Sequence, residues 1–120
     1  MLYGLSASTG FNLYAKATDM RKGFNGLSGM VRNDLGRNPL SGEVFIFLNR
    51  RRTLIKLLVW DNTGYVIYYK RLEAGTFELP SLSDDQNSIR LTRDKLMLIL
   101  EGIELESVKK RKRFSQTFMT

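Results

Sequence analysis

The residues whose chemistry stands out in this sequence are basic, and they are concentrated in two segments. Three consecutive arginines, Arg50, Arg51 and Arg52, lie between two of the most apolar runs of the chain, in the stretch FIFLNRRRTLIKLLVW. An arginine side chain can donate two parallel hydrogen bonds to one phosphate, and clustered cations attract polyanions. These properties indicate nucleic acid as a binding partner. The second segment, KKRKR, consists of Lys109, Lys110, Arg111, Lys112 and Arg113.

The net charge of +7 arises mainly from the second segment. Removing its five cations from the 19 lysines and arginines leaves 14 basic residues against 12 acidic ones, a charge of only +2. Electrostatic affinity for phosphates is therefore expected to come from Arg50–Arg52 and from the basic segment near the C-terminus.

The three arginines have three possible roles. They could form a solvated hairpin turn whose charges protect a sheet edge from unwanted pairing. They could clamp phosphates, or stand at the tip of a two-stranded ribbon that enters a DNA groove. They could also contact an acidic face of a partner protein. Like charges repel at such a turn without an evident structural benefit, which favours the nucleic-acid interpretation.

A second basic pair, Arg21 and Lys22, lies in the segment DMRKGF. If a helix begins at Thr18, both cations fall in its first turn, where free backbone N–H groups favour an anion. The alternative is an ion pair between Asp19 and one of the two cations, which would fix the loop. The sequence leaves both alternatives open.

Catalytic and metal chemistry find little support in the composition. The chain contains no cysteine and no histidine, which excludes thiol nucleophiles, Ser-His pairs and Cys/His zinc sites. The candidate acids for metal-dependent catalysis are Asp19, Asp61, Asp84 and Asp85, and the last three lie at a turn or in a polar loop. We therefore expect no enzyme activity, no cofactor and no metal.

Apolar periodicity predicts the elements that position these residues. Met20, Phe24, Leu27 and Val31 share one face of a helix over about residues 18–35, with Thr18 as its N-cap. Residues 11–16 alternate as a short strand. A meander over residues 43–80 has strands at 43–49, 53–61, 65–72 and 76–80. A second helix over about 92–101 starts at Thr92 and stops at Gly102.

The fold expected is α+β, an antiparallel sheet of about four strands packed with the two helices. The middle strand is apolar on both faces, with Ile55, Leu57 and Val59 on one side, so both faces should be covered. We expect one globular domain over residues 1–106 and a flexible basic tail over 107–120. Trp60 is expected in the core, although it could instead help to form a platform for unpaired bases. Tyr68 and Tyr69 must point to opposite faces.

Three long stretches resemble a known family. TDMRKGFNGLSGMV, NPLSGEVFIFLNRRRTLIKLLVWDNTGYVIYYKRLEAGTFELP and LTRDKLMLILEGIEL are similar, in order and spacing, to the TnpB (Orf2) accessory proteins of bacterial insertion sequences of family sixty-six. The resemblance covers about residues 3–105. It departs at Leu79, where the family often has an aromatic, and the basic tail lies beyond it. The resemblance implies a protein that assists transposition beside a separate, larger transposase.

Together these features predict a non-catalytic transposition accessory protein that binds DNA at or near element ends. The alternative is an adaptor that contacts the transposase through an apolar sheet face without touching DNA. No apolar run approaches the ~20 residues of a membrane span, so a cytoplasmic location is expected. The sequence leaves the oligomeric state and any DNA sequence preference open.

Overall fold

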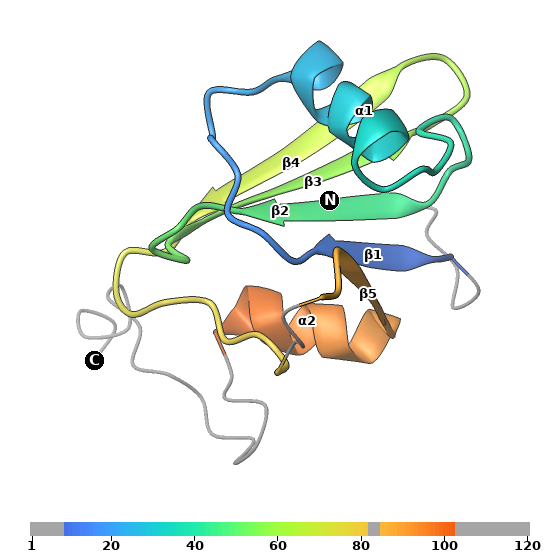
Figure 1. Cartoon of the computed structure of the whole chain (residues 1–120). Coiled ribbons are helices and arrows are strands. Elements are labelled where there is room, and N and C mark those ends of the chain that lie inside the picture. Colours follow the sequence, from blue (N-terminus) through green and yellow to red (C-terminus); the bar gives the residue numbers. More distant parts are fainter. Residues whose placement is uncertain (1–8, 82–84, 103–120) are drawn as a thin grey trace.

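The computed structural model, which describes residues 9–81 and 85–102, is a five-stranded sheet with one helix on each face (Figure 1). The predicted α+β class is confirmed, with five strands in place of about four. The elements are β1 (Phe11–Tyr14), α1 (Phe24–Asn33), β2 (Val44–Leu48), β3 (Leu54–Trp60), β4 (Tyr65–Arg71), β5 (Ser88–Leu91) and α2 (Arg93–Glu101).

The predicted meander is confirmed in its first three strands. β2, β3 and β4 pair antiparallel, with Ile46 opposite Leu57 and Leu57 opposite Tyr68. The short connections between them leave no room for a crossover, so neighbouring strands must run in opposite directions.

The prediction of a purely antiparallel sheet was wrong, because β1 runs parallel to β2. The strand order is β4-β3-β2-β1-β5, and Phe11 of β1 lies opposite Val44 of β2. The segment between these strands contains α1 and carries the chain back across one face of the sheet, as parallel neighbours require. β5 then pairs antiparallel with the free edge of β1, which makes the sheet mixed.

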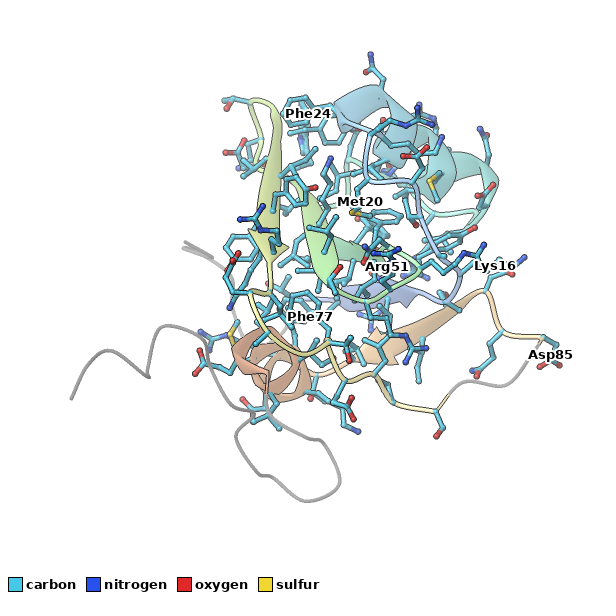
Figure 2. The ribbon with its side chains drawn as sticks, turned by 90° about the vertical axis from the view of Figure 1, so that its left-hand side faces the viewer. Lys16, Met20, Phe24, Arg51, Phe77 and Asp85 are labelled. Carbon is cyan, nitrogen blue, oxygen red and sulfur yellow. The ribbon has the colours of Figure 1, made fainter. Side chains whose placement is uncertain are left out.

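The predicted fourth meander strand at residues 76–80 does not form. This segment leaves the sheet edge after β4, and the Phe77 backbone N–H donates to the Arg52 carbonyl at 2.7 Å. The Phe77 side chain is completely buried between the sheet and α2 (Figure 2). Burial of this ring gives more stabilisation than an edge strand ending in Pro80, which has no N–H for a ladder.

The first helix begins later than predicted, at Phe24, and its N-cap is Gly23 in place of Thr18. The reason is Lys56 of β3, whose side chain is almost fully buried. Its ammonium donates to the carbonyl oxygens of Met20 at 2.7 Å and Lys22 at 2.8 Å. An α-helix starting at Thr18 would use those carbonyls in its own hydrogen bonds, so the lysine stabilises a turn instead.

The second helix follows the prediction closely. The Thr92 hydroxyl accepts from the Lys95 backbone N–H at 3.1 Å, and Gly102 takes the left-handed conformation, with φ 74°, that ends the helix. Lys70 of β4 donates to the Leu100 carbonyl at 2.7 Å. A cation at the negative end of the helix dipole fixes α2 against the sheet.

Both faces of the sheet are buried, as the pattern of the middle strand predicted (Figure 1). The α2 face forms the larger core and the α1 face the smaller one. Fully buried residues of the α2-side core include Leu13, Ile55, Leu57, Phe77 and Leu96, and those of the α1-side core are Leu27, Val31, Phe45, Phe47 and Leu58.

Glu43, which precedes β2, holds three neighbouring segments together. Its Oε1 accepts from Asn12 of β1 at 2.9 Å, from Arg37 at 2.8 Å and from Arg90 of β5 at 3.4 Å. Burial alone would raise the pKa of Glu43, but the hydrogen bonds from Asn12, Arg37 and Ser41 and the charge of Arg37 lower it below its ordinary value of 4.5. The ionised form is therefore the one that the fold stabilises.

A Glu43→Gln substitution should lower the free energy of unfolding at pH 7 by about 1.5–3 kcal/mol, the typical contribution of hydrogen bonds to a charged group. A lowered pKa in the folded state means that this stability is present above pH ~4.5 and is lost as the pH falls through the folded value. The difference in the free energy of unfolding between wild type and variant, measured with urea, should therefore become smaller at acid pH. A difference that is the same at pH 7 and pH 3 would contradict this assignment.

The predicted domain boundary at residue 106 and the basic tail at 107–120 lie outside the described residues. In the part of the chain that is described, no helix is long and apolar enough to cross a membrane.

Candidate nucleic-acid interface

The three arginines occupy the hairpin turn between β2 and β3, and all three are exposed. Asn49 builds this turn: its carbonyl accepts from the Arg52 N–H at 3.1 Å, and its side-chain Oδ1 accepts from the N–H groups of Thr53 and Leu54, both at 2.9 Å. The turn is therefore held by Asn49 and the backbone, without help from the guanidinium groups. Within residues 9–81 and 85–102, none of the three arginines forms an ion pair.

Arg52 has an unfavourable backbone conformation, with φ 58°. At the other hairpin the same left-handed region is occupied by Asn62, a residue type that tolerates it. For a long side chain without a local hydrogen bond the conformation costs about 1–2 kcal/mol. Strain of this kind, kept at a polar surface turn, points to a role for the side chain outside folding.

An Arg52→Gly substitution should stabilise the fold by about 0.5–1 kcal/mol. Glycine relieves the 1–2 kcal/mol of strain and gives back part of it through its greater freedom in the unfolded chain. The matched control is Arg51→Gly, at a position without positive φ, which should lower stability by about 0.5–1 kcal/mol. Thermal or urea unfolding of both variants measures the difference. If both variants lose stability equally, Arg52 is not strained.

Next to the turn lies an open cleft of about 220 Å³. It lies at the end of the sheet where the parallel strands β1 and β2 have their carboxyl ends. Figures 1 and 2 show the segment after β1, with Lys16, and the hairpin turn, with Arg51, at this same end of the sheet. Arg50, Arg52 and Lys16 line the cleft, and Arg51 does not. Its other lining residues are Tyr14, Ala15, Ala17, Leu48, Asn49 and Leu79.

Tyr14 forms part of the cleft wall and is held in a neutral state. Burial raises the pKa of Tyr14, and the neighbouring Asp34 carboxylate raises it further by its charge and by the hydrogen bond between the Tyr14 hydroxyl and Asp34 Oδ2 at 3.2 Å. Tyr14 is mostly buried in the α1-side core, so it contributes a small apolar surface to the cleft, and the charge of the cleft comes from its cations.

The second predicted basic pair, Arg21 and Lys22, lies in the turn before α1 and outside a helix, and neither residue lines the cleft. The structure contains the ion pair considered as the alternative: Arg21 binds Asp19 with an N–O distance of 2.7 Å. Hydrogen bonds from the Arg21 side chain and backbone lower the pKa of Asp19 to about 2. Half of the local positive charge is thereby neutralised.

The predicted aromatic residues divide between the faces of the sheet. Tyr68 packs against the α2-side core, whereas Tyr69 is 53% exposed and its ring lies 4.6 Å from the Lys56 ammonium. Trp60 was predicted in the core but is only half-buried, in edge-to-face contact with Tyr65 at 5.2 Å. It lies at the end of β3, opposite Tyr65 of β4.

The predicted acidic residues do not converge. Asp61 accepts hydrogen bonds within its own turn, and Asp19 is paired with Arg21. Asp85 lies in a loop, and Asp84 falls outside the described residues. Among residues 9–81 and 85–102, no group of three or more acidic side chains could hold a metal ion.

Of the residues that line the cleft, sequence reasoning named Arg50 and Arg52 as site residues and missed the others, including Lys16 and Asn49. Lys16 is a single lysine after a four-residue strand, and only the parallel pairing of β1 with β2 brings it beside the arginine turn. The available signal for Asn49 was its position directly before the arginines, where an asparagine commonly organises a turn through its side chain. The basic residues Lys109–Arg113 lie outside the described residues.

The fold and this turn define a small α+β protein with an exposed basic hairpin beside a cationic cleft. Residues 9–110 match the family described as IS66 Orf2-like protein, and the chain belongs to this family. The family consists of accessory proteins of IS66 transposition, as the resemblance of the sequence implied.

Two relatives come from Sinorhizobium fredii. The uncharacterized protein y4hO is 37% identical over 87 residues, which cover 72% of this chain and 74% of that protein. The uncharacterized protein y4jC is 29% identical over 93 residues, which cover 78% of each chain. No solved structure matches the chain.

Proposed function

We propose that this IS66 Orf2-like protein is non-catalytic and binds DNA at or near the ends of its insertion sequence, through Arg50–Arg52 and the basic segment Lys109–Arg113. The observation that supports this most is the arginine turn. Three adjacent guanidinium groups are exposed and have no ion pair among the described residues, and one of them is kept at a strained backbone position. Phosphate is a ligand that such a cluster fits.

The architecture suits contact with a duplex. The turn joins β2 and β3, two inner strands of the sheet whose central residues are buried. A turn held by a packed sheet can present its arginines to the phosphates of a duplex. Arg21 and Lys22 add weaker positive charge, since Arg21 is paired with Asp19.

The alternative is an adaptor that assembles or regulates the transposase without direct DNA contact. The sheet faces that it was expected to use are covered by α1 and α2. What favours an adaptor is a different surface: Phe24 at the start of α1 is 50% exposed and Tyr69 of β4 is 53% exposed. Exposed aromatics are enriched at protein interfaces.

The test is a pull-down of the purified protein with terminal-repeat DNA and with the transposase, separately and together, over a range of salt concentrations. DNA binding through several phosphates should weaken steeply as salt rises, whereas apolar docking should not. Deleting residues 109–120 should weaken binding to all duplexes by the same factor, because phosphate contacts carry no sequence information. Capture of the transposase alone, at every salt concentration, would favour the adaptor.

A further inference from the structure

The cleft beside the arginine turn has an apolar wall that the proposed duplex contact does not use. Its rim carries Lys16, Arg50 and Arg52, its wall includes Tyr14, Leu48 and Leu79, and among the described residues no carboxylate lines it. The phosphate backbone of a duplex would be bound by the cations alone. A site that combines three cations with a small apolar wall, in which Tyr14 and Leu48 are mostly buried, fits a group that is anionic at one end and apolar at the other.

We propose that this cleft binds a single unpaired nucleotide of a DNA strand, an inference that rests on the proposed DNA contact. The phosphate would lie on the cationic rim, and the sugar and base would lie against the wall. Arginine and lysine donate to phosphate oxygens, and a base packs favourably on an aromatic or apolar surface.

The openness of the cleft supports a piece of a polymer as the ligand. The cleft measures about 220 Å³ and is open to solvent, so the strand on either side of a bound nucleotide can continue outside it. A nucleotide that projects from its strand can enter such a concave site, whereas the convex backbone of an intact duplex cannot.

The position of the cleft supports ligand binding as well. It lies just beyond the carboxyl ends of β1 and β2, the parallel pair of the sheet. Ligands commonly bind at the carboxyl ends of parallel strands. The arginine turn is also divided between two surfaces, since Arg50 and Arg52 line the cleft and Arg51 does not. Arg51 is thus assigned to the duplex, and its neighbours to the projecting nucleotide.

The experiment compares three DNA probes of equal phosphate number by fluorescence anisotropy, using the full chain and an internal dye. One probe is a blunt duplex, one has an unpaired overhang at its end, and one has an unpaired nucleotide as an internal bulge. Wild type should bind the overhang probe about tenfold tighter than the blunt one, at the low end of the effect of stacking one base. The bulge probe shows whether the unpaired nucleotide must be at a strand end.

Two variants separate the cleft from the duplex contact, and the ratio of overhang to blunt affinity is the readout. Ala17→Leu fills the cleft at an exposed position without changing charge, and should bring the ratio close to one. Arg51→Ser should weaken binding to both probes by the same factor and keep the ratio. Lys16→Gln, which is also exposed, provides a second cleft variant if Ala17→Leu does not fold.

The outcomes distinguish this inference from the function it rests on. Equal affinities of wild type for overhang, bulge and blunt probes would overturn the cleft site and leave the duplex contact standing. A tenfold preference that survives in both cleft variants would also overturn it. Failure to bind any of the three probes would overturn the proposed DNA contact itself.

Discussion

Replacing Phe77 with alanine should lower the free energy of unfolding by about 3–5 kcal/mol, as expected for a fully buried phenylalanine. Phe77 lies outside every helix and strand, yet its side chain is fully buried in the α2-side core. Its backbone N–H also holds the arginine turn, through the Arg52 carbonyl. The cavity left by the ring would lie beneath the sheet, where rigid strands cannot collapse to fill it.

The matched control for this prediction is Phe24→Ala. The chemical change is the same, but the Phe24 side chain is 50% exposed at the start of α1, so much less apolar area is lost. Urea unfolding of both variants gives the comparison directly. If the two variants lose similar amounts of stability, the segment after β4 is not packed as the structure shows.

Phe77 also shows a limit of predicting secondary structure from local sequence patterns. The apolar residues at 76–80 fit a strand, and nothing local shows that the chain turns beneath the sheet instead. Burial of one ring against α2 decides the outcome, and α2 lies some twenty residues further along. By contrast, β2, β3 and β4 could be predicted, because alternation and short turns are local signals.

The start of α1 shows a similar limit. The apolar stripe was correct for Leu27 and Val31, which lie in the α1-side core. The residues before Gly23 were predicted as helical because their periodicity continued. Lys56, more than thirty residues away, binds the carbonyls of Met20 and Lys22 and so determines where the helix begins. α2 had its signals at its own ends, in Thr92 and Gly102, and was predicted correctly.

The candidate site shows the same difference between what local sequence signals predict and what distant contacts determine. The arginine turn could be read from the sequence because its residues are adjacent. The cleft could not, because Lys16 reaches it only through the parallel pairing of β1 and β2. The partner of a four-residue strand is set by the crossover that contains α1, and the strand's own residues do not specify it.

Replacing Arg50, Arg51 and Arg52 together with serine should abolish most of the DNA affinity while leaving the fold intact. The turn is built by Asn49 and the backbone, and no guanidinium group of the turn forms an ion pair among the described residues. Surface substitutions of this kind change stability by no more than about 0.5 kcal/mol. The strands on either side keep their register, because their buried faces are unchanged.

The effect on DNA binding can be stated as a salt dependence. Each lost phosphate contact makes the slope of log affinity against log salt shallower by about 0.9, so three contacts correspond to about 2.7. Single Arg→Lys changes should also weaken binding, since lysine keeps the charge and loses the forked donor geometry. Anisotropy titrations at several salt concentrations measure both effects, and a transposition assay tests whether they matter for the element.

The same triple variant separates the two functions under consideration. If the protein binds DNA, binding to element ends and transposition should fall together. If it is an adaptor that uses the turn, only capture of the transposase should be lost. A triple variant that supports transposition at the wild-type rate would show that neither function depends on the turn, and that the strain at Arg52 serves no ligand. The arginines would then be solvated charges at a turn between two inner strands of the sheet.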